Sequence, residues 1–190
     1  MRLDHETRYQ HRSAAEGWLR LCRYKPTKPD YIEQLAASYG FEAPLEAAIA
    51  YTPGLGRLID GPLRPRAGYI AQDLLELDFT PSEVSRILQC LPIAPFPNAV
   101  GALGWMYVVE RVALTHGTVR EHLQTHLPIA AEACAYLSAS DESRWAAFGS
   151  LVDSVVRPDQ VSDLIVAAHA AFRTRVHWFK RVASWEAYGP

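Results

Sequence analysis

The sequence has few cysteines and no long hydrophobic stretch. Its three cysteines, Cys22, Cys90 and Cys134, are far apart and form no CxxC pair, which argues against a disulfide framework and against a zinc site. No apolar run approaches the roughly 20 residues that a membrane span needs. The first six residues, MRLDHE, lack the apolar core of a signal peptide. We therefore expect a cytoplasmic protein that does not engage a membrane.

An excess of charge of one sign is also lacking. The chain has 19 basic and 21 acidic residues, which gives a formal net charge of −2. Nucleic-acid binding depends on a concentration of positive charge that neutralises phosphates. This balance argues against a nucleic-acid partner.

Strand signals are almost absent, because alternating runs of polar and β-branched residues do not occur. Segments with helical periodicity fill the chain instead and are separated by Pro and Gly. The expected helices cover approximately 4–23, 30–51 with an interruption at Gly40 or Pro44, 69–77, 81–89, 99–125, 128–137, 141–155 and 159–185. We predict an all-α, single-domain bundle over residues 1–190 with about seven helices.

The expected helix 99–125 carries a carboxylate in an apolar stripe. Its positions at alternating three- and four-residue steps share one face, and they are Val100, Leu103, Tyr107, Glu110, Leu114 and Gly117. A buried charge must be paired or protonated. Glu110 therefore either faces a cofactor or bound water, or forms an internal salt bridge to an arginine such as Arg8 or Arg57.

His11 lies on the first expected helix, close to its apolar face. A histidine near a helix start is most often a surface or capping residue. A neutral imidazole on a rigid helix is, however, also what an axial iron ligand requires.

Several segments, taken in order, resemble the bacterial biliverdin-producing heme oxygenases. Thr7-Arg8-Tyr9-Gln10-His11 resembles the family's Thr-x-x-x-His, and Gly104-Trp105-Met106-Tyr107-Val108-Val109-Glu110 resembles its Gly-Trp-Leu-Tyr-Val-x-Glu. Weaker similarities follow the same order, at 31–35, 66–78, 144–148 and 167–179.

The resemblance implies a bundle of the heme oxygenase type, with one heme between a proximal helix and a distal helix. Heme would be both cofactor and substrate, cleaved to biliverdin, carbon monoxide and iron with electrons from an external ferredoxin, flavodoxin or reductase. It makes His11 the axial iron ligand, and Tyr107, Arg8 and Arg175 candidate pocket or propionate contacts. The distal, catalytic side would comprise Glu110, Thr115, His116 and Gly117.

The sequence departs from the family after Glu110. The family continues Gly-Ser-x-Leu-Gly-Gly, whereas this chain reads Arg111-Val112-Ala113-Leu114-Thr115-His116-Gly117. Glycines allow a helix to bend and to approach a ligand closely. Gly117 would supply the bend two residues late, His116 would bind the iron as a second axial ligand, or a straight helix would close the pocket and leave a heme-free protein. His116 as a solvent-facing residue, in a run with His122 and His126, is equally open.

Two alternative functions follow from this departure. The first is a non-catalytic heme-binding or heme-sensing protein. The second is another enzyme of the wider heme oxygenase-like group, such as the thiaminase-like enzymes, for which the proximal histidine has no role.

Overall fold

The computed structural model describes residues 2–55, 59, 63, 65–140 and 142–186, and within them the chain is helical with no strand. The α-helices are α1 (Arg2–Arg20), α2 (Lys28–Ala50), α3 (Ala67–Glu76), α4 (Pro81–Ser85), α5 (Ala99–Ala113), α6 (His116–His126), α7 (Ala135–Ser138), α8 (Glu142–Val155) and α9 (Val161–Glu186). Short 3-10 turns cover Pro128–Ala131 and Pro158–Gln160. The prediction of an all-α chain is confirmed. No helix in this described part combines the length and apolar character that a membrane span requires.

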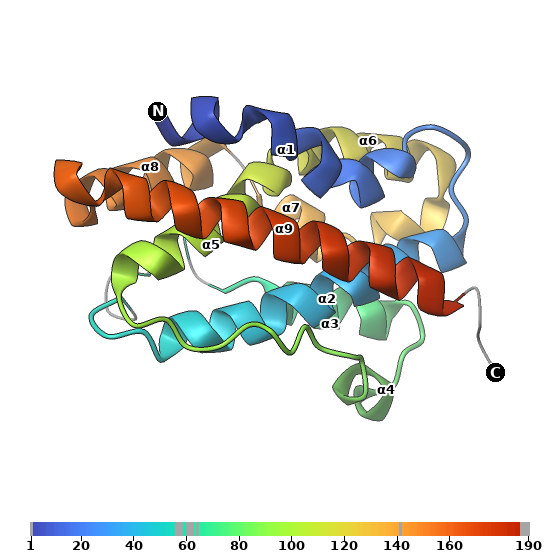
Figure 1. The fold of residues 1–190 in the computed structure, drawn as a ribbon. Helices are drawn as coiled ribbons and strands as arrows, with labels where there is room; N and C mark the ends of the chain where they lie inside the picture. Colours follow the sequence, from blue (N-terminus) through green and yellow to red (C-terminus); the bar gives the residue numbers. More distant parts are fainter. Residues whose placement is uncertain (1, 56–58, 60–62, 64, 141, 187–190) are drawn as a thin grey trace.

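Helix α5 forms the centre of the molecule. It packs most extensively against α9, while α1 and α6 lie on one side of it and α2 and α3 on the other (Figure 1). The contact with α9 depends on Gly104, where an added Cβ would lie 2.6 Å from the Cβ of Ala167 and 2.8 Å from the carbonyl oxygen of Leu164. The backbones of α5 and α9 therefore approach each other closely at Gly104.

Helix α2 is continuous, which corrects the predicted interruption at Gly40 or Pro44. It begins with a capping box between Thr27 and Asp30, which satisfies amide groups that have no partner within the helix. Gly40 is needed for packing, because a Cβ there would lie 2.3 Å from the carbonyl oxygen of Leu88. Burial of the apolar side chains around Pro44 holds the helix together past the proline.

The predicted single helix 99–125 is interrupted, and this prediction was wrong. Helix α5 ends at Ala113, Leu114 and Thr115 form a turn, and α6 begins at His116. The Thr115 backbone N–H and hydroxyl both bond to the Val112 carbonyl oxygen, at 2.9 and 2.8 Å. The bend therefore occurs without the glycines that the resemblance would require. Gly117 lies in the first turn of α6 and does not supply it.

Candidate functional site

His11 is in direct contact with α5. Its Nε2 lies 2.9 Å from Thr7 Oγ1 and 3.1 Å from the hydroxyl of Tyr107. The Thr7 hydroxyl donates to the Leu3 carbonyl and the Tyr107 hydroxyl donates to Asp4. The two hydroxyl groups also lie 3.0 Å from each other, so Nε2 of His11 is part of a closed hydrogen-bonding network between α1 and α5. Burial, with a smaller contribution from Arg111, lowers the pKa of His11 and keeps the ring neutral at pH 7.

The residues around His11 do not fit a heme in this arrangement. The space between α1 and α5, where the resemblance would place the heme, is occupied by side chains of the protein, since Tyr107 reaches His11 and Arg111 Nε lies 3.0 Å from Asp4 Oδ1. Arg111 stands where the family has its first distal glycine. In addition, the Nε2 that would bind iron is within hydrogen-bond distance of Thr7 and Tyr107.

The other residues singled out from the sequence are spread over the molecule. Arg8 is on the exposed face of α1, bonded to His5 and Tyr9. Arg175 of α9 is buried, and its Nε donates to the Ala14 carbonyl at 3.2 Å. The structure therefore unites His11 with Tyr107 but brings neither Arg8 nor Arg175 to them through any contact described.

His116 is fully buried, so its interpretation as a solvent-facing residue is wrong. Its ring packs on Tyr136 and Trp18, with centroid distances of 4.8 and 5.5 Å. Its Nδ1 lies 3.1 Å from Ser140 Oγ. Burial, followed by the charge of Arg66, lowers the pKa of His116 far below that of a free imidazole. His116 contacts α1 at Trp18. Trp18 lies seven residues, or about two helical turns, after His11, so the two histidines lie in different parts of the core.

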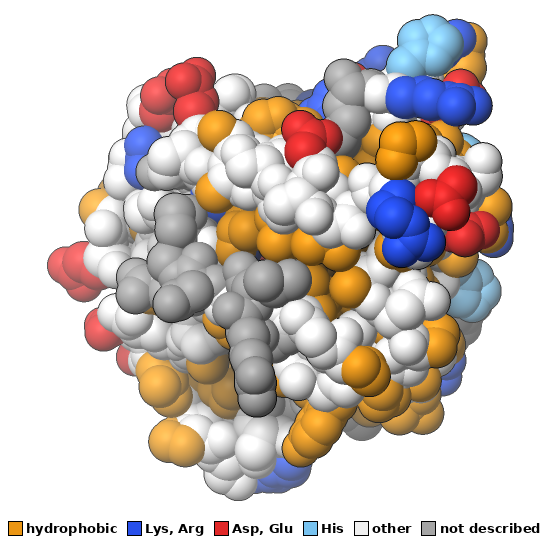
Figure 2. Space-filling model, turned by 90° about the vertical axis from the view of Figure 1, so that its left-hand side faces the viewer, with side chains coloured by type: hydrophobic (Ala, Val, Ile, Leu, Met, Phe, Trp, Pro, Cys, Tyr) orange, Lys and Arg blue, Asp and Glu red, His pale blue; other side chains and the backbone are white. Residues whose placement is uncertain are grey.

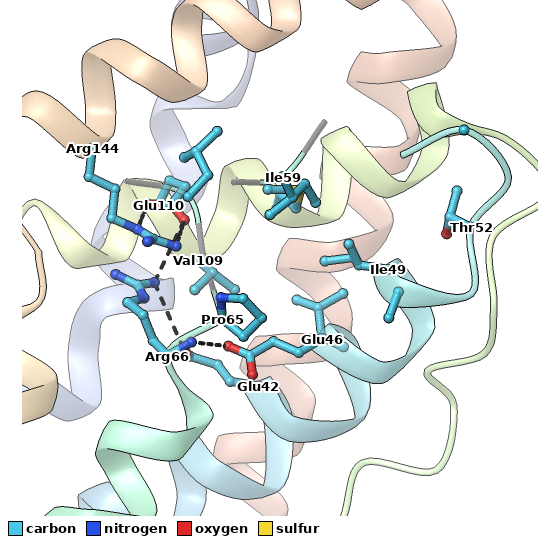
Figure 3. A pocket seen from close by; sticks show the side chains of 15 residues that line it. Glu42, Glu46, Ile49, Thr52, Ile59, Pro65, Arg66, Val109, Glu110 and Arg144 are labelled. Carbon is cyan, nitrogen blue, oxygen red and sulfur yellow. Dashed lines mark hydrogen bonds and ion pairs between the residues drawn. The ribbon is translucent and has the colours of Figure 1, made fainter. Parts of the chain in front are cut away.

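A cavity of about 800 Å³ lies on the opposite side of α5 from α1. Its apolar walls come from the second half of α2, from α5 and from residues that precede α3, and its polar end is formed by three carboxylates and two guanidinium groups (Figure 3). The apolar residues that line it are Leu45, Ile49, Ala50, Ile59, Leu63, Pro65, Met106 and Val109. On the face of the molecule that lies to the left in Figure 1, hydrophobic side chains gather in a hollow (Figure 2). The space is large enough for a drug-sized organic molecule.

Glu110 forms a buried bidentate ion pair at the polar end of this cavity. Arg144 donates from Nε and Nη2 to its two carboxylate oxygens, at 2.8 and 2.7 Å. The prediction of an internal salt bridge is correct, but the partner is not Arg8. Arg57 lies outside the described residues. Arg144 comes from α8, which only the tertiary fold brings beside α5.

Arg66 and Glu42 retain unused hydrogen-bonding atoms. Arg66 Nη1 donates to Ser140 Oγ at 2.6 Å, while its Nη2 lies 3.8 Å from Glu42 Oε2, beyond hydrogen-bond distance. The other oxygen of Glu42 accepts a hydrogen bond from the Tyr136 hydroxyl. Among the described residues, neither Arg66 Nη2 nor Glu42 Oε2 has a hydrogen-bond partner. Both atoms are buried behind the polar end of the cavity and have almost no accessible surface of their own.

Glu46 completes the polar end. It accepts hydrogen bonds from the backbone N–H groups of Arg66 and Ala67, which are free at the start of α3. Burial, opposed by these bonds, raises the pKa of Glu46 to about 7. Glu46 thus positions α3 and Arg66 against the cavity, and it changes charge near neutral pH.

The described residues contain no group of three or more His, Cys, Asp or Glu side chains arranged to hold a metal ion. His122 and His126 stack with their ring centroids 4.2 Å apart on the exposed side of α6. Each of these two histidines also lies within hydrogen-bond distance of a backbone carbonyl.

Sequence reasoning missed Glu42, Glu46, Arg66 and Arg144. A signal existed for Glu42, because it lies between the apolar residues Phe41 and Leu45. Glu110 was identified by the same kind of pattern, a carboxylate within an apolar stripe. No comparable signal marks the arginines, which come from a loop and from α8. Comparisons with family models, with curated proteins and with solved structures find no match for this chain.

Proposed function

We propose that this protein binds a small organic molecule in the cavity between α2 and α5. The observation that carries the proposal is the cavity of about 800 Å³, whose apolar walls end at the buried charged side chains of Glu42, Arg66 and Glu110. The cavity walls would remove the apolar body of a ligand from water, and its polar end would lie beside these charged side chains. This proposal corresponds to the alternative of a non-heme, thiaminase-like member of the group.

The cavity proposal is tested with a probe that has no polar head. Toluene in the low millimolar range should receive saturation transfer from the protein in NMR experiments. Ala50, exposed and on the cavity rim, is replaced in Ala50→Trp to block the space. Ala47, equally exposed on α2 but outside the cavity lining, provides the matched control Ala47→Trp. Transfer that is absent in the parent protein, or equal in both variants, contradicts the proposal.

We propose a bundle of the heme oxygenase type in a cytoplasmic protein. In support, the resembling segments fall on α1, α2, α3, α5, α8 and α9 in the expected order, and the chain bends shortly after Glu110.

Heme binding at His11, with cleavage to biliverdin by an external electron donor, is the second candidate. It is favoured by one specific observation, namely that α1, which carries His11, packs against α5, which carries Tyr107, as the resemblance requires. Binding would require α1 to separate from α5 and Nε2 to give up its hydrogen bonds.

Heme titration decides this second candidate. A Soret band that shifts on binding in the parent protein and in His5→Ala, but not in His11→Ala, supports it; His5 is an exposed control on the same helix. Release of biliverdin on addition of ascorbate would extend it to catalysis. A titration that is identical for His5→Ala and His11→Ala contradicts axial ligation by His11.

A further inference from the structure

A second hollow lies between the C-terminal half of α9, the segment that follows α4, and α2. Its volume is about 350 Å³, which is at the lower end of the range for small-molecule sites. Among the described residues, none that lines this hollow also lines the α2–α5 cavity. We call it the α9 groove. Its apolar walls consist of Ala36, Ile87, Leu88, Cys90, Leu91, Pro92, Trp178 and Val182.

The walls of the α9 groove are held against α2 by hydrogen bonds to the α2 backbone. Trp178 Nε1 donates to the carbonyl oxygen of Ala37 at 2.8 Å, and the Cys90 backbone N–H donates to the carbonyl oxygen of Gly40 at 2.8 Å. Gly40 permits this close approach, because a Cβ there would lie 2.6 Å from Trp178 Cζ2. The groove is therefore formed before any ligand arrives, which lowers the entropic cost of binding.

Two leucines of the groove leave apolar surface in contact with water. Leu88 is 52% exposed and Leu91 is 89% exposed, and both belong to the segment between α4 and α5. An apolar chain that lies against these side chains would remove them from water, which is favourable. The walls therefore suit a hydrocarbon body.

The polar part of the groove carries positive charge. Arg181 and His177 line it, and no carboxylate among the described residues does so. Between Leu164 and Ala183, the only charged side chains of α9 are basic. Burial raises the pKa of Cys90 to about 11, and the positive charge of Arg181 opposes this effect. The charge of Arg181 therefore acts inside the groove, beside a wall residue.

Both polar residues can bind an anionic head group. A guanidinium group has five N–H donors, so Arg181 can bind an anion in addition to its other contacts. The neutral imidazole of His177 has an N–H donor in either tautomer. Hydrogen bonds from a guanidinium to a carboxylate are charge-assisted and are stronger than neutral ones.

We propose that the α9 groove binds medium-chain fatty acids. The hydrocarbon chain would lie against Leu88, Leu91 and Trp178, and the carboxylate would bind at Arg181 and His177. This site is separate from the α2–α5 cavity, and the inference does not depend on the function proposed for that cavity.

The test compares three molecules that share one hydrocarbon chain and differ in the charge of the head. At pH 7, octanoate is negative, 1-octanol is neutral and octylammonium is positive. NMR titrations below micelle-forming concentrations use the full chain with Ala50→Trp, so that the α2–α5 cavity does not contribute. We expect octanoate to bind about fivefold or more tightly than either of the other two.

A substitution of Arg181 tests the head group. Arg181→Gln should weaken octanoate binding about fivefold or more and leave 1-octanol binding unchanged, because only the carboxylate uses the guanidinium charge. Arg173→Gln is the matched control, since Arg173 is exposed on the same helix but does not line the groove. It should change neither affinity.

A substitution of Leu88 tests the wall. Leu88→Glu places a carboxylate in the apolar wall, so it should weaken octanoate binding and reverse the order of octanoate and octylammonium. Leu75→Glu is the matched control, since Leu75 is 44% exposed on α3 and lies outside the groove. Circular dichroism and a thermal melt confirm that each variant is folded.

Several results would overturn the proposal. They are octanoate binding that is no tighter than that of octylammonium, equal losses in Arg181→Gln and Arg173→Gln, and equal losses in Leu88→Glu and Leu75→Glu. A dimer in sedimentation experiments that Leu88→Glu converts to a monomer would show that a second copy of the chain covers the groove, and it would also overturn the proposal. The toluene experiment on the parent protein decides the α2–α5 cavity separately.

Discussion

The ion pair between Glu110 and Arg144 gives the sharpest stability prediction. Glu110 and Arg144 are 4% and 6% exposed, and their two hydrogen bonds are short and parallel. Glu110→Leu keeps an apolar side chain in the space but leaves the guanidinium group of Arg144 without its two bonds to the carboxylate. Breaking a buried pair from one side costs about 3–5 kcal/mol. For a chain of this size, that loss corresponds to a decrease of roughly 6–20 °C in Tm.

Arg144→Met should lower the free energy of unfolding less than Glu110→Leu does. The double variant should lower it by less than the sum of the two single losses. In Arg144→Met, Glu110 keeps Arg66 at 3.9 Å as a nearby counter-charge. In the double variant Glu110→Leu, Arg144→Met, neither charge remains, and apolar replacement of a whole buried pair is often neutral. We expect a coupling free energy of about 2 kcal/mol or more between the two positions.

Equilibrium unfolding in urea, followed by circular dichroism on the full chain, measures these quantities. Arg157→Met is the control, since the Arg157–Asp159 pair is exposed and such pairs contribute about 0–1 kcal/mol. The reasoning is refuted if Glu110→Leu loses less than about 1 kcal/mol or if the two substitutions are additive.

Two further predictions concern packing and pH. Gly104→Ala should lower the free energy of unfolding by about 2 kcal/mol or more, because its Cβ would overlap Ala167 and the α9 backbone. Gly101→Ala on the same helix, where the nearest atom is 3.7 Å away, should instead raise it by up to about 1 kcal/mol in the same urea assay; equal effects would contradict the α5–α9 contact. His116 has a lowered pKa in the folded protein, so the unfolded chain takes up the proton first as the pH falls. Its contribution to stability should be complete above pH ~6.5 and should decline below it, by at most about 1.4 kcal/mol per pH unit. The difference in unfolding free energy between the parent and His116→Asn, measured from pH 8 to pH 5, isolates this slope from the opposite contribution of Glu46; a pH-independent difference would show that His116 titrates normally.

Periodicity and capping signals predicted most helices, because these signals are local. Asn98, a residue type that is common at helix starts, caps α5, with its side chain accepting from the Gly101 N–H at 3.0 Å. Thr80 and Glu83, at the spacing of a capping box, form one at the start of α4. The predictions failed where tertiary contacts outweigh local preference. Helix α2 continues past Pro44 because its surroundings bury it, and the central helix stops at Ala113 although no proline or glycine ends it.

The candidate site could be predicted only in part. Periodicity identified Glu110 as a buried carboxylate that needs a partner, and the structure confirms an internal salt bridge. It could not identify that partner, since Arg144 lies 34 residues further along the chain and an arginine on an amphipathic helix has no feature that marks it as buried. His116 was missed as a core residue for a related reason, because the turn at Leu114 and Thr115 rotates it inward.

The sequence by itself determined the all-α class, the order of the helices and the need to neutralise Glu110. These properties depend on periodicity, capping and the cost of a buried charge, all of which act within a few residues. Only the tertiary structure decided that α1 closes on α5 around His11 and that the open cavity lies on the other side of α5. The physical reason is that both features depend on side chains from distant helices, Asp4 with Arg111 and Glu42 with Arg66, whose proximity no local pattern encodes.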